Sequence, residues 1–240
     1  MNLKSLLNEY KALVIFDTET TGLDPDTKQI IELAALRVEC TETGALRIAD
    51  RMDTFIKLPE GEKLPGNIIE LTGITDRMLE TEGVQPAAAA SQIAAMMQDG
   101  PVLMIAHNAQ FDAGFLRNLL RGYRFSTVHW LDTLTVYKDR RPYPHKLANA
   151  ITAYNLDDKV QNSHRAIDVV LALFEVLKAM DEERDDLLLY VNLFGYNPKF
   201  GISGQKVNGV LYAAQRFRDR MTDPDETLPA IAGRGLGVIL

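Results

Sequence analysis

The chain alternates between short apolar runs and segments with helical spacing, and this order predicts an α/β fold. Residues 12–16 form an uncharged apolar run, which predicts a buried strand. Two further runs, separated by a turn near Gly44, predict an antiparallel meander with it. In all, strands are predicted at residues 12–16, 29–38, 47–58, 102–106 and 128–131, with one more within residues 207–217.

Helical spacing follows most of these strands. Pro86 suits the first turn of one helix, and Ser163 is a candidate N-cap for another. The predicted helices are residues 86–98, 112–121, 132–137, 146–154 and 164–180. We expect the end of the chain, from Met221 onwards, to be loosely held.

Composition narrows the class of protein. A chain of 240 residues with 46% hydrophobic and 25% charged residues is typical of one globular domain, with or without an appendage. The net charge of −7 argues against a broad nucleic-acid-coating surface, so any contact with nucleic acid must be local. Cys40 is the only cysteine, which excludes an internal disulfide, and we expect it to be a small buried side chain. No signal peptide or membrane-spanning stretch is recognisable, so we expect a cytoplasmic protein without a membrane partner.

Two acids follow the first strand. Side chains two apart in a strand project from the same face, so Asp17 and Glu19 are expected to point to one place. Their charges repel unless a cation lies between them, and carboxylate oxygens suit Mg²⁺ or Mn²⁺.

Two more acids stand at the ends of apolar elements. Asp112 is equally suited to cap a helix, and Asp168 lies on an apolar helix where an acid needs a partner. His164 precedes Asp168 by one helical turn, and its ordinary pKa of about 6.5 lets it accept a proton from water. A surface hydrogen bond between the two is the alternative. Glu32, inside the second strand, is interpreted as an ion-pair partner or an exposed edge residue rather than a catalytic one.

Three segments together resemble the motifs of the DEDDh exonuclease family, in family order. They are residues 16–23 (Phe-Asp-Thr-Glu-Thr-Thr-Gly-Leu), 107–112 (His-Asn-Ala-Gln-Phe-Asp) and 164–168 (His-Arg-Ala-Ile-Asp). The resemblance implies a ribonuclease H-like fold, in which a mixed five-stranded sheet is flanked by helices. It places an exonuclease domain in residues 1–180 and leaves residues 181–240 as a C-terminal appendage.

The resemblance also implies an activity and a partner. Similar domains serve as the proofreading epsilon subunit of bacterial DNA polymerase III, as freestanding DNA exonucleases or as trimming ribonucleases. The expected reaction is two-metal 3′–5′ exonuclease cleavage at single-stranded DNA or RNA 3′ ends, with DNA favoured and a DNA polymerase as a possible partner. By position, Asp17, Glu19, Asp112 and Asp168 would hold two Mg²⁺ or Mn²⁺ ions, and His164 would be the general base.

Residues around these motifs are candidates for substrate contact. Those implied by the resemblance are Thr18, Thr20, Leu23, Leu71, Thr72, Asn108 and Phe111, although Phe111 fits a core position equally well. His107 is interpreted as a structural hydrogen-bonding residue and Trp130 as a core residue. Candidate phosphate contacts are Arg140, Arg141, Lys146 and Arg165.

Two other classes of protein stay open. A polymerase-tethered binding module could keep this fold without turnover, but the complete set of acids and His164 argue against it. In an α/β protein without a site, the acids would be caps and ion pairs, which leaves the ordered match of three motifs unexplained.

Overall fold

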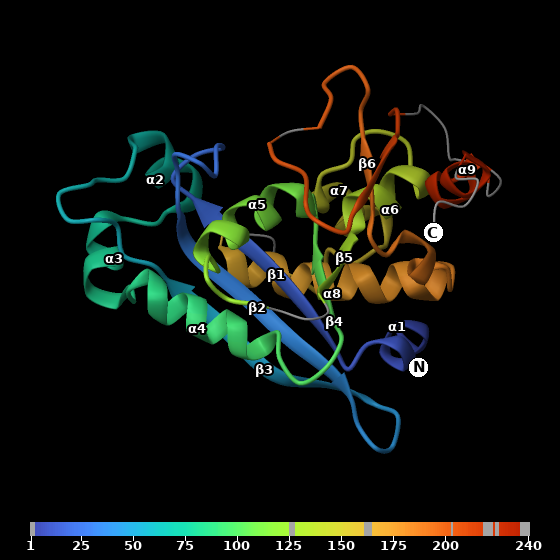
Figure 1. Cartoon of the computed structure of the whole chain (residues 1–240), viewed down its shortest axis with the longest axis horizontal. Helices are drawn as coiled ribbons and strands as arrows, with labels where there is room; N and C mark the ends of the chain where they lie inside the picture. The colour runs from blue at the N-terminus through green and yellow to red at the C-terminus, as the bar shows by residue number, and fades with distance from the viewer. Residues whose placement is uncertain are drawn as a thin grey trace.

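The computed structural model describes residues 3–124, 128–160, 165–202, 204–217, 223 and 226–235. A five-stranded mixed sheet with the order β3-β2-β1-β4-β5 forms its centre (Figure 1). β1 is antiparallel to β2, which is antiparallel to β3, while β4 and β5 run parallel to β1. The strands are β1 (Ala12–Thr20), β2 (Ile30–Cys40), β3 (Leu46–Phe55), β4 (Val102–Ala106) and β5 (Val128–Asp132). The predicted ribonuclease H-like α/β fold and its meander are confirmed.

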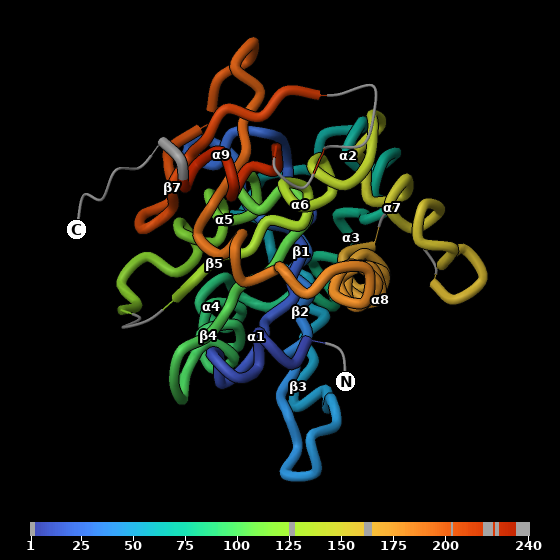
Figure 2. Tube along the Cα trace, turned by 90° about the vertical axis from the view of Figure 1, so that its right-hand side faces the viewer, coloured from blue at the N-terminus to red at the C-terminus, as the bar shows by residue number. Residues whose placement is uncertain are grey.

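Helices cover both faces of the sheet. Figure 2 shows α8 on one side of the strands and α4 on the other. The helices of the described residues are α1 (Lys4–Glu9), α2 (Gly66–Thr72), α3 (Asp76–Glu82), α4 (Pro86–Met96), α5 (Ala109–Leu119), α6 (Thr133–Arg140), α7 (Leu147–Ala153), α8 (Ala166–Glu183), the 3₁₀ helix η1 (Leu187–Tyr190) and α9 (Leu228–Gly235).

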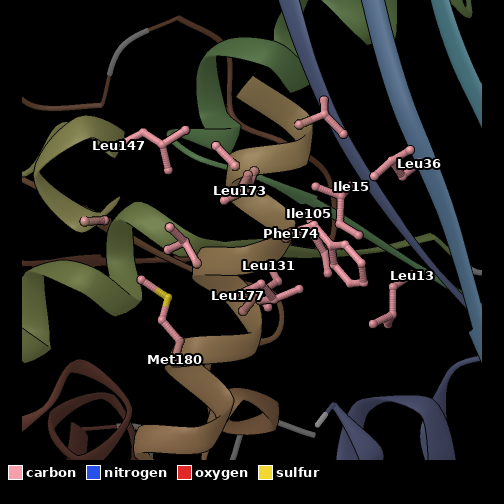
Figure 3. Close-up of a cluster of buried hydrophobic side chains, with 14 of the residues drawn as sticks. Leu13, Ile15, Leu36, Ile105, Leu131, Leu147, Leu173, Phe174, Leu177 and Met180 are labelled. Atoms are coloured by element: carbon pink, nitrogen blue, oxygen red, sulfur yellow. The ribbon is translucent and has the colours of Figure 1, made fainter. Parts of the chain in front are cut away.

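β1 is central because its apolar side chains are buried on both faces. Leu13 and Ile15 project toward α8, where they pack with Leu173 and Phe174 (Figure 3). The alternate residues of β1, such as Phe16, belong to a second cluster with α4 and α5. Packing on both faces fixes the register of β1, and with it the direction of every side chain that follows.

Two features differ from the predictions near the meander. Residues 59–85, for which no element was predicted, contain α2 and α3. Both helices have only seven residues, and single residues mark their ends. Thr75 caps α3 by accepting from the backbone N–H of Met78, and Gly73 ends α2 with a left-handed φ of 70°. Cys40 is exposed, so the expectation of a buried side chain is wrong; it ends β2 beyond the helices that cover the sheet.

The C-terminal segment forms a second, parallel sheet of β6 (Leu193–Tyr196) and β7 (Leu211–Ala214). β7 lies within the strand predicted in residues 207–217. β6 was not predicted, because the residues in and after it are typical of turns. Asn192 joins this segment to the edge strand β5: its backbone N–H donates to the carbonyl O of Trp130 at 2.8 Å, and its Oδ1 accepts from the Trp130 N–H at 2.9 Å. These two bonds close the open edge of the main sheet.

Asp139 of α6 forms hydrogen bonds with three parts of the C-terminal segment. Its carboxylate, only 3% exposed, accepts hydrogen bonds from Tyr190 Oη (3.2 Å), Gln215 Nε2 (2.8 Å) and the Leu228 N–H (2.6 Å). Leu228 is buried at the start of α9. The expectation of a loosely held end is therefore wrong for α9, because long-range bonds rather than local propensity hold it. No helix in the described part of the chain is long and apolar enough to cross a membrane.

Candidate active site

The second half of β1 carries the first pair of acids. The strand continues through Thr20 because its pairing with β2 extends to Ile30, past the end of the apolar run. Asp17 and Glu19 therefore project from one face of β1, whereas Thr18 and Thr20 project from the other. The strand geometry expected for the two acids is what the structure shows.

Asp112 joins them from the first turn of α5. Its carboxylate is 3% exposed and accepts two hydrogen bonds through Oδ1, from the Thr18 N–H (3.1 Å) and from Thr18 Oγ1 (2.7 Å). Thr18 lies between Asp17 and Glu19 in the sequence, so these bonds fasten α5 directly to the acidic end of β1. Three acids from two segments therefore lie at this end of β1, near enough for their charges to interact.

Burial and mutual repulsion raise the pKa values of these acids. Burial raises the pKa of Asp17 well above its ordinary range, and the charges of Asp112 and Glu19 raise it further. Burial and the charges of Glu32 and Asp112 raise the pKa of Glu19 to about 7. Burial also raises the pKa of Asp112 to about 7, even though the bonds from Thr18 favour its charged form. Without a cation, burial and mutual repulsion therefore disfavour the simultaneous ionisation of the three acids.

The start of α8 is fastened beside Glu19. Glu32 of β2 pairs in register with Glu19, is fully buried, and accepts from Arg165 Nε (2.8 Å) and the Ala166 N–H (3.1 Å). The ion-pair interpretation of Glu32 is confirmed, and edge exposure is excluded because β2 lies inside the sheet. These bonds bring the first turn of α8, with the half-buried Asp168, to the acidic end of β1.

Some predicted residues fall outside this geometry. His164 and Ser163 lie outside the described residues, so the general base and the cap stay predictions. Within the described chain, no group of three or more His, Cys, Asp and Glu side chains is close enough to hold a metal ion. The acids nevertheless shift one another's pKa, and hard carboxylate oxygens are a donor set that Mg²⁺ or Mn²⁺ accepts. The donor chemistry therefore fits a cation, and the carboxylates must close around it.

Sequence analysis missed Asp132 at the end of β5. Its Oδ1 accepts from the N–H groups of Asn108 (2.9 Å) and Ala109 (3.1 Å), and its Oδ2 accepts from the Thr135 N–H (3.1 Å). It thus holds the starts of α5 and α6 together while Asn108 takes a left-handed φ of 74°. An acid directly after an apolar strand was its signal, the same one that marked Asp17. Because several donors occupy both oxygens of Asp132, its role is to position α5.

His107 is a structural residue, as predicted. Its Nε2 donates to the carbonyl O of His145 at 3.0 Å, and its Nδ1 lies 3.0 Å from Thr133 Oγ1. Burial lowers its pKa, which favours the neutral ring. Trp130 packs against the core and meets Phe16 edge-on at 6.1 Å between ring centroids, also as predicted. It also lines a hollow of about 880 Å³ between α5, β5 and residues 205–209.

The predicted substrate residues divide into two groups. Leu23 (84% exposed), Leu71 (53%) and Asn108 are open to solvent. The hydroxyls of Thr18, Thr20 and Thr72 donate within the protein, to Asp112 Oδ1, Gly22 O and Ile68 O. Phe111 is half-buried against Phe115, with 5.0 Å between ring centroids. Their substrate contacts stay predictions.

The expected phosphate contact of Arg140 is wrong. Its side chain is fully buried and donates to Met180 O, Glu183 and Asp186. Arg141 pairs with Glu183 at 2.7 Å, and Arg165 pairs with Glu32. Glu183 at the end of α8 and Asp186 just after it therefore neutralise these two arginines, a pairing of distant segments that local sequence does not reveal. Lys146 is exposed.

This fold and this set of acids define a nuclease-like α/β domain, and comparison with known proteins gives its family. The exonuclease family, RNase_T, matches residues 14–177, and the chain belongs to it. It is 33% identical over 177 residues to a PolC-type DNA polymerase III of Clostridium perfringens, covering 72% of this chain and 12% of that protein. With the PolC-type enzyme of Bacillus subtilis it is 32% identical over 198 residues, covering 77% and 12%. The chain thus spans about an eighth of these polymerases.

Solved structures show the same fold. A structure of E. coli exonuclease I matches with a TM-score of 0.62 at 19% identity, covering 75% of this chain and 43% of that one. A second, in complex with a dA16 oligonucleotide, matches with a TM-score of 0.61 at 18% identity, covering 75% and 42%.

Proposed function

We propose that this chain is a metal-dependent 3′–5′ exonuclease that releases nucleoside 5′-monophosphates from single-stranded 3′ ends. One observation carries the proposal: in a member of the exonuclease family, Thr18 fastens Asp112 to the end of β1 between Asp17 and Glu19. The raised pKa values of these acids are what a site built for cations should have in their absence.

The cofactor would be two divalent cations, Mg²⁺ or Mn²⁺, held by Asp17, Glu19, Asp112 and Asp168. When bound, they would activate water and neutralise charge on the leaving oxygen. The chain itself supplies the alignment of the ligands: Thr18 fixes Asp112, and Glu32 fixes the helix that carries Asp168. His164 would accept the proton of the attacking water.

The terminal nucleotide would lie against residues around these acids. Leu23 and Leu71 offer exposed apolar surface for a base or sugar, and Asn108 is exposed at the start of α5. Thr18, Thr20, Thr72 and Phe111 would line the same region, the threonines through their backbone because their hydroxyls are engaged.

DNA is the favoured substrate, and RNA is the alternative. The PolC-type relatives are DNA polymerases, and the similar exonuclease I structure holds a DNA oligonucleotide. A polymerase partner in proofreading, or a freestanding role in DNA repair, fits the same chemistry in the cytoplasm. We also propose that residues 1–180 form the exonuclease unit and residues 181–240 an appendage, because the family match ends at residue 177.

Digestion of end-labelled single strands tests the proposal. We expect 5′-labelled DNA to shorten stepwise with Mg²⁺, 3′-labelled DNA to release labelled mononucleotide at once, and EDTA to stop both. Parallel RNA substrates measure the sugar preference. Asp17→Asn should remove the activity, whereas Asp50→Asn, which changes an exposed acid of β3, should retain it. If Asp17→Asn keeps both its activity and its dependence on Mg²⁺, the assignment is overturned.

A further inference from the structure

Aromatic side chains gather on one part of the surface. Phe200 (72% exposed), Tyr143 (63%) and Phe217 (44%) are exposed, and Tyr123 (41%) is the only other exposed aromatic side chain in the described part of the protein. Two of the three, Phe200 and Phe217, belong to the C-terminal segment, outside the residues that the exonuclease family matches. Exposed aromatic rings that cluster need an explanation beyond chance.

Phe217 packs against other residues of this cluster. Its ring centroid lies 5.4 Å from that of Tyr143, with 36° between the planes, and 5.3 Å from the ring of His145. Lys138 Nζ lies 5.4 Å from the same centroid. Contacts with the loop before α7 thus fix the ring, although nearly half of it stays open to solvent.

Two cations stand beside these rings. Lys199 and Arg216 are exposed, and with Asn197, Pro198 and Phe217 they line a hollow of about 380 Å³. Lys199 Nζ lies 5.3 Å above the Phe200 ring. Neither cation forms an ion pair with an acid within the described ranges, whereas Arg140, Arg141 and Arg165 all do. In a chain of net charge −7, two exposed cations thus stand beside one hollow, and an exposed acid, Glu226, lines the adjoining hollow with Arg216.

The cluster adjoins the candidate active site through one loop. The carbonyl O of His145 accepts from His107, which directly precedes Asn108 and the helix that carries Asp112. α6 and α7 pack with α8 against one face of the sheet, whereas α5 packs with α4 against the other, so this hydrogen bond joins elements of both faces. Tyr143 lies on this loop, with its ring centroid 5.8 Å from that of His145, so one ring of the cluster belongs to the loop that contacts the residue preceding α5.

We propose that Tyr143, Lys199, Phe200, Arg216 and Phe217 form a second binding surface for single-stranded nucleic acid, which we term the strand patch. This inference rests on the proposed exonuclease function. Bases stack on the three rings and phosphates contact the two cations, the combination that holds single strands without sequence preference. The strand patch therefore binds nucleotides several positions 5′ of the terminal one, and long substrates bind more tightly than short ones.

A double variant, Lys199→Ala with Arg216→Ala, tests the strand patch without touching the acids. The matched control is Lys4→Ala with Arg51→Ala, which removes the same charge from two exposed positions elsewhere. For an oligothymidylate of about 20 nucleotides, we expect the patch variant to raise KM ~10-fold with kcat unchanged, and to flatten the salt dependence of binding. Hydrolysis of the p-nitrophenyl ester of thymidine 5′-monophosphate, which occupies only the acidic site, should not change. Phe200→Ala should raise the KM of the oligomer in the same way.

The other outcomes of these experiments test the strand patch and the proposed exonuclease function separately. Equal KM values for the patch variant and its control would overturn the inference while leaving the exonuclease proposal intact. If the wild-type protein hydrolyses neither substrate, the proposed function fails. Binding of the fluorescent oligomer in EDTA then decides the strand patch by itself, because a loss of affinity only in the patch variant supports it and equal affinities refute it.

Discussion

Thr18 and Asp112 are joined by two hydrogen bonds across 94 positions of sequence. Both bonds end on Oδ1 of Asp112, and Thr18 stands between the two acids of β1. The threonine is therefore the contact through which the sheet sets the position of an acid on a helix. Its hydroxyl and its backbone N–H share that task.

Thr18→Val should weaken this link without removing a charge. Loss of the hydroxyl bond costs about 1 kcal/mol of unfolding free energy. Because the bonds from Thr18 lower the pKa of Asp112, their partial loss should raise it further, and the acid limb of the pH–rate profile should move to higher pH. Thr27→Val is the control, since its hydroxyl bonds an exposed aspartate, and it should change neither quantity. An unmoved acid limb would contradict the role given to Thr18.

Asp17→Asn should separate activity from stability. Burial and three neighbouring acids disfavour the charge of Asp17, so a neutral amide of the same size should keep or raise the melting temperature of the metal-free protein. Activity should fall below detection. A large drop in melting temperature would show that the acid serves the fold rather than a cation.

Stability of the metal-free protein should fall as the pH rises. The carboxyl of Glu19 ionises near 4.5 when unfolded and near 7 in the folded chain, so the folded state binds more protons between these values. Its contribution is thus fully present below about pH 4.5 and is lost as the pH rises through about 7. Millimolar Mg²⁺ should reverse the trend, because it binds the ionised acids and stabilises the folded state. We expect a larger metal-induced rise in melting temperature at about pH 8 than at about pH 5.5, measured by thermal denaturation with and without EDTA. Equal rises at both pH values would argue against cation binding by these acids.

Glu32→Gln should impair catalysis more than folding. The amide can still accept from Ala166, but the ion pair with Arg165 is lost, so the first turn of α8 with Asp168 is less firmly placed. A misplaced ligand should lower kcat about tenfold or more, with a stability loss of roughly 1–2 kcal/mol. Glu39→Gln, at the far end of β2 in an ion pair with Arg37, is the control and should leave kcat unchanged. Equal loss of kcat in both variants would exclude a specific role for Glu32.

The sequence predicts those elements whose bounds depend on neighbouring residues. β4 was predicted at its observed bounds because its apolar residues stand between a helix stop and a polar loop. The convergence of Asp17, Glu19 and Asp112 followed from strand periodicity together with a family resemblance. Periodicity does not show which distant groups meet, so the burial of Arg140 by the acidic run and the bonds of Asp132 were missed.

The same limit explains the errors in the C-terminal half. β6 contains Gly195 and is followed by Asn197 and Pro198, which read locally as turns. It is a strand because Asn192 fixes it to Trp130 and the Gly195 N–H donates to Thr135 Oγ1. Only the folded chain supplies these partners.

The hydrogen bonds of Asp139 indicate how far the chain can be shortened. Its contacts with Tyr190, Gln215 and Leu228 come from residues that a chain ending at residue 180 would lack. Such a shortened chain would lose these three donors and the residues that cover Asp139, and β5 would lose the neighbour that closes its edge. The nuclease half and the tail should then melt in one transition, and the shortened chain should be prone to aggregate rather than fold into a smaller enzyme.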